Sequence, residues 1–442
     1  MSPSISLLSA TSDLAYPHRI ESAPWFAAGE QLDGASVCNR VIELASEREW
    51  PARPYAVYVH VPFCKSICSF CALYAQALGG TPERRLDEYL SGVLRSLELN
   101  PWQGSNRAPT TVHFGGGTPL VLGARRFERL KQGLIDAFGD SPACEWAVET
   151  TTSSLDSATI DLLEALCVRR IHLGIQTLDD ATRSRLGRQE SGQKAIARVM
   201  ELEARGFHTS VDLILGLDGV SEVMIEEDLS RLYQAGVRMF SICELRERSR
   251  AQTLAKQHDA ARARRHYAAW QTIWRFMERV GLIPIHCGQF ARNHADNLYF
   301  THPARGEDCV AIGPYAHGSV GHVTYGNLLL PEYYQSIRAG ELPIAFGADY
   351  SAAEQAVCAL ERKLLAHGVL CGELSDLLNT FPNCFEDVLE TWIAKGLLQA
   401  ATGEQGFTVT MSGSWFVGNM IADVRALAEY VSPTDTQMTA VT

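Results

Sequence analysis

From Tyr55 to Val280 the chain alternates between short apolar runs and longer segments whose apolar residues recur at helical spacing. The short runs are rich in β-branched and aromatic residues, which is typical of strands buried on both faces. Each of these predicted strands precedes a predicted helix: 56–61, 110–116, 145–150, 170–176, 210–217 and 237–245. Such alternation predicts a parallel sheet, either open and doubly wound or curved into a partial barrel. Both forms place the functional site at the carboxyl ends of the strands.

The pattern changes at about residue 351. Segments 353–368 and 384–396 have helical spacing, and 396–410 is predicted to form a hairpin with a Gly-rich turn. Helices followed by a hairpin are typical of a winged-helix fold, so residues 351–442 are predicted to form a small α+β domain of that kind. Because this segment is not strongly basic, we expect a structural or substrate-lid role for it and do not expect it to bind DNA.

Residues 1–53 are irregular and rich in Pro, Ser and Glu, and they predict an N-terminal extension with one helix near residues 41–48. The core is then expected to span residues 54–350. The formal charge of −12, from 39 basic and 51 acidic residues, argues against nucleic acid as a partner. We expect no membrane span, because the sequence has no apolar run of about 18 residues.

The distribution of the cysteines predicts the compartment in which the protein is located. Most of the 12 cysteines are scattered singly along the chain, unlike the dense pattern of a small secreted disulfide scaffold. No signal peptide is recognisable at the N-terminus. A cytoplasmic enzyme with reduced thiols is therefore expected.

Three cysteines stand apart from the rest. Cys64, Cys68 and Cys71 are spaced C-x3-C-x2-C and follow the first predicted strand directly. Three thiolates on one short loop can each bind one iron of a [4Fe–4S] cluster, which leaves the fourth iron open to a ligand. A structural zinc site would need a fourth ligand, usually from a second pair, and none is evident. Burial of all three in the core is the other alternative, but a loop after a proline is poorly suited to core packing.

Two further motifs lie at predicted strand ends. Gly115, Gly116 and Gly117 close the second strand, where the lack of Cβ atoms lets the backbone approach a ligand or make a tight turn. Glu149 ends the third strand, where its carboxylate can accept hydrogen bonds from a ribose or an ammonium group. A helix-cap or surface role for Glu149 remains an alternative.

The fourth and fifth predicted strands also carry candidate ligand-binding residues. Gln176 ends the fourth strand and Arg188 follows it, and an arginine suits a carboxylate ligand because its guanidinium binds in a bidentate way. Asp212 lies in the fifth strand and is either a ligand contact or a turn residue. The neighbouring Arg183 and Arg185 are expected to face solvent.

The string VYVHVPFCKSICSFC resembles the radical S-adenosylmethionine (SAM) superfamily, and in particular the oxygen-independent coproporphyrinogen III oxidase-like family with its Y-x-H-x-P-F-C-x3-C-x2-C motif. The resemblance implies a partial (β/α)6 barrel that holds a [4Fe–4S] cluster and SAM, with two SAM molecules in several members. By the same resemblance the cluster ligands, which also serve catalysis, are Cys64, Cys68 and Cys71. The implied cofactor-binding residues are Tyr58, Phe70, Gly115, Gly116, Gly117, Thr118, Glu149, Gln176, Arg188 and Asp212.

The resemblance also gives these residues roles. It implies that the glycine loop contacts the amino group of SAM, that Arg188 pairs with its carboxylate and that Asp212 accepts a hydrogen bond from it. Gln176 is implied to contact the nucleoside or the substrate. The implied region for substrate and a second SAM is 281–350. Its candidate lining residues are Tyr299, Tyr315, His317, Tyr325 and Asn327.

The chain departs from the decarboxylases of this family in two places. Leu73 stands where those enzymes have a further cysteine, and Thr150 to Thr152 replace the usual residues of an E-x-x-P string. The expected activity is therefore that of the class C methyltransferases and cyclopropanases. These relatives add a methyl or methylene unit from a second SAM to an sp2 carbon. The expected partners are a small conjugated substrate and an electron donor such as flavodoxin or ferredoxin.

Three alternatives to this activity stay open. The first is anaerobic heme degradation, in which a SAM-derived methylene radical opens the porphyrin ring. The second is decarboxylation like that of the coproporphyrinogen oxidases. The third is a heme chaperone, in which His317 or His60 would be an axial ligand of the heme iron.

Replacement of Cys64, Cys68 or Cys71 by Ala should abolish the visible absorbance of the cluster, because each thiolate is expected to bind one iron. Replacement of a scattered cysteine such as Cys167 serves as the control and should leave the absorbance intact. The assignment is refuted by a variant of the triplet that keeps both a full cluster and activity.

Overall fold

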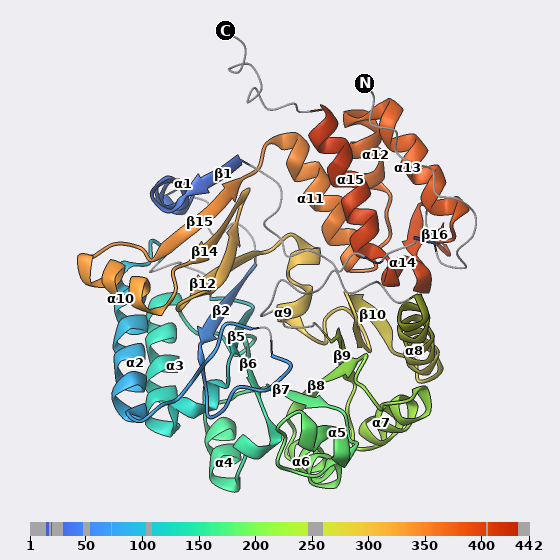
Figure 1. Cartoon of the computed structure of the whole chain (residues 1–442). Coiled ribbons are helices and arrows are strands. Elements are labelled where there is room, and N and C mark those ends of the chain that lie inside the picture. Colours follow the sequence, from blue (N-terminus) through green and yellow to red (C-terminus); the bar gives the residue numbers. More distant parts are fainter. Residues whose placement is uncertain are drawn as a thin grey trace. The chain divides into compact units, whose positions relative to one another are not determined.

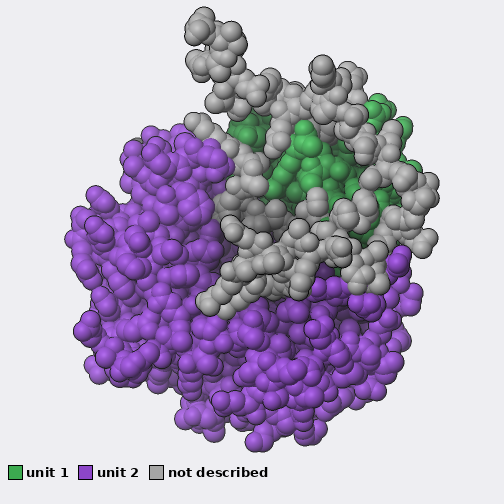
Figure 2. Space-filling view, viewed as in Figure 1, with its two compact units in different colours: residues 1–29, 350–442 green, residues 30–349 purple. Residues whose placement is uncertain are grey.

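The computed structural model describes residues 15–16, 19, 30–46, 54–71, 73–102, 108–245, 260–403 and 405–431. The chain divides into two compact units, one of residues 30–349 and one that joins residues 1–29 to residues 350–442 (Figure 2). The larger unit contains the predicted strand–helix repeats, and the smaller one contains the C-terminal helices and hairpin.

Parallel strands form the centre of the larger unit (Figure 1). In the order in which they pair, they are β2 (Tyr55–Val61), β5 (Thr111–Gly116), β6 (Glu145–Thr150), β7 (Arg170–Gln176), β8 (His208–Leu215) and β9 (Met239–Glu244). Most of their side chains are buried, because helices cover one face and the barrel interior the other. Such strands therefore read as continuous apolar runs. The predicted strands are confirmed, and their bounds differ from the prediction by no more than two residues.

A helix follows each of these strands. These helices are α2 (Pro82–Leu99), α3 (Ala124–Phe138), α4 (Ser157–Ala165), α6 (Gly192–Ala204), α7 (Glu222–Gln234) and α8 (Ala260–Arg279), with the short α5 (Asp180–Arg185) before α6. Helix α4 is capped by Asp156, α6 by Ser191 and α7 by Ser221, and the side-chain oxygen of each cap accepts a backbone N–H of the first turn. Neighbouring helices pack together, α2 with α3 and α7 with both α6 and α8.

The sheet continues beyond the six central strands on both sides. On the β2 side lie β12 (Asp308–Ile312), β13 (His317–Val320), β14 (Val323–Asn327), β15 (Ile344–Asp349) and β1 (Glu30–Asp33), of which only β12 runs parallel to its inner neighbour. On the β9 side lie β11 (Gln289–Ala291) and β10 (Ile283–His286), both antiparallel. Because β2 and β9 pair with β12 and β11 and not with each other, the barrel is partial, as the resemblance implied.

Several short elements complete the larger unit. They are the strand pair β3 (Phe63–Cys64) and β4 (Gln76–Ala77), the helices α9 (Leu298–Thr301) and α10 (Leu330–Ala339), and the 3-10 helices η1 (Pro119–Leu122), η2 (Thr152–Ser154) and η3 (Pro303–Arg305).

Residues 30–46 belong to the larger unit, although the sequence places them in an N-terminal extension. Strand β1 pairs with β15, and helix α1 (Gly34–Ser46) begins well before the helix expected near residue 41 and packs on the same strand. Val37 of α1 is fully buried over Gly347, where an added Cβ would come within 2.9 Å of the valine side chain. The run that forms β1 is short and polar, so its sequence pattern does not predict a strand.

The smaller unit has the element order of a winged helix. It contains α11 (Ala352–Leu365), α12 (Gly372–Thr380), α13 (Pro382–Ala394), the hairpin of β16 (Leu398–Ala400) and β17 (Phe407–Val409), then α14 (Met411–Trp415) and α15 (Val417–Val431). Trp392 is fully buried and donates a hydrogen bond of 2.9 Å to Asp423. Tyr16 donates to the same carboxylate, so the N-terminal part of this unit is attached to α15. No helix in the described part of the chain combines the length and apolarity needed to cross a bilayer.

Arg183 was expected to face solvent, and this prediction is wrong. Its side chain is 2% exposed, and it donates hydrogen bonds to the carbonyl oxygens of Ile175, Thr177 and Glu190 at 2.8 to 2.9 Å. The physical reason is the turn after β7, where these carbonyls point inward and require donors. Arg185 is exposed, as predicted.

Replacement of Arg183 by Met should lower the free energy of unfolding by roughly 2–4 kcal/mol, because it leaves buried carbonyl groups without their donor. The matched change of Arg185 to Met should cost less than about 0.5 kcal/mol, since that side chain is exposed. Urea denaturation of both variants measures the difference. Equal losses would contradict the structural role of Arg183.

Candidate active site

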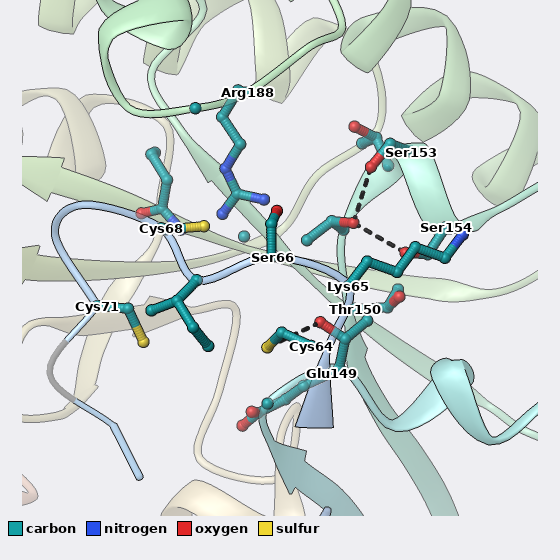
Figure 3. Close-up of a pocket in the computed structure, with 18 of the residues that line it drawn as sticks. Cys64, Lys65, Ser66, Cys68, Cys71, Glu149, Thr150, Ser153, Ser154 and Arg188 are labelled. Carbon is teal, nitrogen blue, oxygen red and sulfur yellow. Dashed lines mark hydrogen bonds between the residues drawn. The ribbon is translucent and has the colours of Figure 1, made fainter. Parts of the chain in front are cut away.

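The carboxyl ends of β5 to β8 and the cysteine loop after β2 enclose a cavity of about 260 Å³ (Figure 3). Most of the residues proposed from the sequence to bind the cofactors line it: Cys64, Cys68, Phe70, Cys71, Gly116, Gly117, Thr118, Glu149, Gln176, Arg188 and Asp212. Tyr58 and Gly115 lie beside it. The cavity is also lined by residues that the motifs do not include, among them Thr151 to Ser154, His172 and Glu190.

The cysteine loop is closed at its base by backbone pairing. Strand β3 ends at Cys64, and β4 returns alongside it with hydrogen bonds from Gln76 N to Pro62 O at 2.7 Å and from Leu78 N to Cys64 O at 2.9 Å. Inside the loop, Cys71 N donates to Cys68 O at 3.3 Å. Figure 3 shows the three sulfur atoms on this loop, at the side of the cavity opposite Ser153 and Ser154.

The thiol of Cys64 has the most defined surroundings of the three. Burial raises its pKa, as do the neighbouring thiols, while the hydrogen bond from Thr118 and the positive charge of Arg188 act in the opposite direction. The Thr118 hydroxyl lies 3.5 Å from the sulfur atom. A hydrogen bond and a positive charge near a thiolate both stabilise its anionic form, which is the form that binds metal.

The three thiols fit a cluster better than a single ion. Among the described residues, no three His, Cys, Asp or Glu side chains converge as ligands of one metal ion. A cubane cluster takes each thiolate on a different iron atom, so the sulfur atoms are expected to stand apart. The soft donor set and the open cavity beside it therefore suit an iron–sulfur cluster with one iron accessible to a ligand.

Backbone hydrogen bonds connect the glycine loop at the end of β5 to the residues that precede Cys64. Gly117 N donates to Val61 O and Thr118 N to Phe63 O, both at 2.8 Å. A Cβ atom at Gly117 would stand 2.4 Å from Phe63 O, and Gly116 has a φ of 100°. Gly117 is therefore required by the close approach of two backbones and Gly116 by its positive φ, in addition to any contact with a ligand.

Two carboxylates of the cavity wall are each held by a buried histidine. Glu149 Oε1 lies 2.8 Å from His113 Nε2, and Asp212 Oδ1 lies 2.7 Å from His172 Nε2. Burial by itself raises the pKa of Glu149, but the hydrogen bond and charge of His113, the charge of His172 and the hydrogen bond from Gly116 N together outweigh burial, and the pKa is lowered. Glu149 is therefore a carboxylate at neutral pH and no helix cap.

The sequence analysis missed both histidines. His113 and His172 lie on β5 and β7, and their side chains are at most 3% exposed. A signal was present, because each is the one strongly polar residue inside an otherwise apolar strand, two residues before a glycine. A buried polar side chain of this kind needs a partner, and the partner here is a carboxylate at a strand end.

Gln176 ends β7 in a strained backbone conformation. Its φ of 71° is in the left-handed region, next to a register shift between β7 and β8. Such a conformation in a residue other than Gly costs about 1–3 kcal/mol and is found mostly at functional sites. At the neighbouring Gly174, a Cβ atom would stand 2.8 Å from Gln176 Nε2 and 3.1 Å from Arg188 Nη2. The glycine thus leaves room for both side chains at one point of the cavity wall.

Unsatisfied polar atoms gather around this cavity. Among the buried side-chain atoms of the described residues, Thr150 Oγ1, Arg188 Nε and Glu190 Oε2 have no hydrogen-bond partner, and all three residues line the cavity. The wall thus offers donors and an acceptor, and it carries both Arg188 and the carboxylates of Glu149 and Asp212. A ligand that is cationic at one group and anionic at another fits such a wall, as SAM is with its sulfonium, ammonium and carboxylate groups.

The predicted substrate residues do not all come together. Tyr299 stacks on His113 and Tyr58, with ring centroids 4.0 and 5.5 Å away, just behind the carboxylates. Tyr315 and His317 lie beside each other, with their ring centroids 5.1 Å apart. Tyr315 also contacts Tyr74, at the end of the cysteine loop.

Tyr325 and Asn327 lie elsewhere. Both are buried on β14, where the Tyr325 hydroxyl accepts a hydrogen bond from Ala311 N and the Asn327 amide donates to Gly313 O. These contacts hold the backbone of β12 and of the residue that follows it, and a substrate contact at Tyr325 or Asn327 stays a prediction.

His60, a candidate heme ligand, has both ring nitrogens engaged. Nδ1 lies 3.0 Å from the Tyr58 hydroxyl and Nε2 lies 2.9 Å from the carbonyl oxygen of Tyr74. Because burial lowers the pKa of His60 to about 4, the ring is neutral. Its Nε2 therefore donates to Tyr74 O, its Nδ1 accepts from Tyr58, and the ring connects β2 to the end of the cysteine loop.

Replacement of Gln176 by Gly should raise the free energy of unfolding by about 1 kcal/mol, because glycine adopts a φ of 71° without strain. The same change should weaken SAM binding, since it removes a side chain from the cavity. The control is Gln189, which lines the cavity and has no left-handed φ, and its change to Gly should not stabilise the fold. Denaturation and SAM titration measure the two effects, and a Gln176→Gly protein that is less stable than the parent would contradict the assignment of strain.

Comparison with known proteins gives a match to one domain family and several similar proteins. Residues 58–232 match the radical SAM superfamily. The heme chaperone HemW of Mycobacterium tuberculosis is 29% identical over 325 residues, which cover 70% of this chain and 82% of that protein. Anaerobilin synthase of Escherichia coli O157:H7 is 27% identical over 397 residues, which cover 86% of each protein.

A solved structure shows the same fold. Coproporphyrinogen III oxidase (HemN) from Escherichia coli aligns with a TM-score of 0.75 and 20% identity over 92% of this chain and 99% of that one. A [4Fe–4S] cluster and SAM are the cofactors that this superfamily implies, and the thiols and cavity wall described above fit them. Residues 58–232 form a radical SAM domain, and the relatives of the chain include a heme chaperone, an anaerobilin synthase and oxygen-independent coproporphyrinogen III oxidases.

Proposed function

We propose that this radical SAM enzyme adds a one-carbon unit derived from SAM to an sp2 carbon of a conjugated substrate. The observation that carries the proposal is the cavity at the strand ends, which is lined by the three thiols, Arg188, Glu149, Asp212 and Gln176. When bound there, the cluster would supply the electron for reductive cleavage of one SAM, and a second SAM would supply the one-carbon unit.

The residues of the chain then have the following roles. Cys64, Cys68 and Cys71 hold the cluster, and the glycine loop beneath them keeps Cys64 in place through Thr118. Arg188 binds the carboxylate of SAM, and its guanidinium lies 5.7 Å from the ring of Phe70, which limits the positions it can take. Glu149 and Asp212 accept hydrogen bonds from the ammonium and ribose groups, and Gln176 contacts the nucleoside.

Leu73 supports this activity over decarboxylation. It lines the cavity, its side chain is 56% exposed, and it takes the place where the decarboxylases of the family carry a further cysteine. A leucine offers no thiol at that position and instead gives an apolar surface at the mouth of the cavity. An apolar surface there suits the flat face of a conjugated substrate.

Anaerobic opening of the heme ring is the second candidate. It is favoured by the match with anaerobilin synthase, which extends over 86% of both chains and so includes regions outside the superfamily core. For a heme chaperone, His60 is a poor axial ligand because both its ring nitrogens already have partners in the fold, and His317 stays the candidate ligand. Heme degradation and one-carbon transfer share their first steps and differ in the substrate.

The test is an anaerobic incubation of the reconstituted protein with SAM, a reductant and one of three substrates: heme, coproporphyrinogen or an indole compound. The amounts of 5′-deoxyadenosine and S-adenosylhomocysteine are measured together. We expect near-equal amounts of both with the true substrate, because each transfer consumes one SAM as radical source and one as carbon source. The Cys68→Ala protein is the control and should form neither product.

The other outcomes separate the alternatives. A response to heme alone supports ring opening. Deoxyadenosine without S-adenosylhomocysteine, in the presence of coproporphyrinogen, supports decarboxylation and overturns the proposal. Stoichiometric heme transfer without either product, from a protein with a full cluster, supports the chaperone.

A further inference from the structure

We propose that His172 is a positioning residue that orients Asp212 for its hydrogen bond to SAM. The inference rests on the proposed contact between Asp212 and SAM and does not depend on one-carbon transfer. The motifs assign a role to Asp212 and none to His172.

His172 lies in the wall of the cavity, where its side chain connects two neighbouring strands. It is on β7, its side chain is 3% exposed, and it faces Ser210 of β8 in the strand register. Its Nδ1 lies 2.7 Å from Ser210 Oγ and its Nε2 lies 2.7 Å from Asp212 Oδ1. With a short hydrogen bond at each ring nitrogen, the imidazole cannot rotate, and the carboxylate of Asp212 is fixed with it.

Asp212 keeps access to the cavity despite this bond. Its side chain is 27% exposed and it lines the cavity, while the histidine is almost fully buried behind it. The arrangement resembles the outer hydrogen-bonding partners of metal ligands, which hold a ligating side chain at the correct angle from behind. A carboxylate held in this way does not have to give up rotational freedom when the ligand binds.

The charges around His172 support the same role. The groups that face it are Asp212 on β8, Glu149 on β6 and Arg170 on its own strand, and the ring of Phe300 packs 5.5 Å away. Burial alone would lower the pKa of His172, but the two carboxylates outweigh burial and Arg170, and its pKa is raised. A raised pKa favours the form of the ring that donates from both nitrogens, and the partners of these nitrogens are Ser210 and Asp212.

The test compares three substitutions of His172 that fill a similar space but differ in which of its hydrogen-bond partners the new side chain can contact. In His172→Gln the amide nitrogen takes the place of Nε2 and still reaches Asp212. In His172→Asn the amide takes the place of Nδ1, so it reaches Ser210 and not Asp212. His172→Leu reaches neither. The dissociation constant for SAM is measured anaerobically by calorimetry on the cluster-loaded protein, without substrate.

We expect the Gln protein to bind SAM within about threefold of the parent, and the Asn and Leu proteins to bind about tenfold more weakly or worse. The rate of 5′-deoxyadenosine formation at saturating SAM should change by less than about twofold in all three, because the residue orients a binding group and touches no reacting atom. The melting temperature of each apoprotein shows which variants are folded. Phe300→Leu, which alters the packing against the rings of His172, His113 and Tyr299 but removes no side-chain hydrogen bond, should bind SAM as the parent does.

A double-mutant cycle with Asp212→Asn gives the decisive result. If His172 acts through Asp212, adding His172→Leu to Asp212→Asn should cause no further loss of SAM binding. Additive losses would overturn the proposal, as would a folded His172→Leu protein that binds SAM normally or an Asp212→Asn protein that does. Because these measurements need no substrate, failure of one-carbon transfer would leave them unchanged, and the two proposals fail separately.

Discussion

The close approach of two backbone loops is the constraint on which the site depends. The glycine loop after β5 passes directly beneath the cysteine loop after β2 and donates hydrogen bonds to Val61 O and Phe63 O, the residues that lead into Cys64. The spacing leaves no room for a Cβ atom at Gly117. Since parallel strands end at one edge of the sheet, this contact also determines where the thiols stand relative to the polar groups that end β6, β7 and β8.

Two carboxylates of the cavity wall are each paired with a buried histidine, Glu149 with His113 and Asp212 with His172. Such pairing offsets the free-energy cost of removing a charge from water. Arg183 stabilises the turn after β7 in a similar way, by donating to backbone carbonyls. Gln176 has a strained, left-handed φ at the end of β7, and the surrounding fold stabilises this conformation, which the residue alone would not adopt.

Periodicity and motif spacing were sufficient to predict the central sheet, its helices and the residues around Cys64. Buried parallel strands have a strong apolar signal, and three cysteines at this spacing on one loop suit few sites apart from an iron–sulfur cluster. The antiparallel strands of the large sheet were not predicted, because elements such as β1 and β13 are short and owe their conformation to the neighbour with which they pair. Tyr325 and Asn327 show a related limit, since a polar residue in a Gly-rich stretch can serve the backbone as readily as a ligand.

The smaller unit is assembled from both ends of the chain, with Tyr16 bonded to Asp423 of the last helix. This arrangement has a consequence during synthesis on the ribosome. Residues 30–349 emerge complete and can fold while the C-terminal segment is still being made, because domains generally fold as units as the chain emerges. Tyr16 must wait for its partner until Asp423 of α15 has been translated. The larger unit is thus expected to form first, and the pairing of Tyr16 with α15 is expected to follow it.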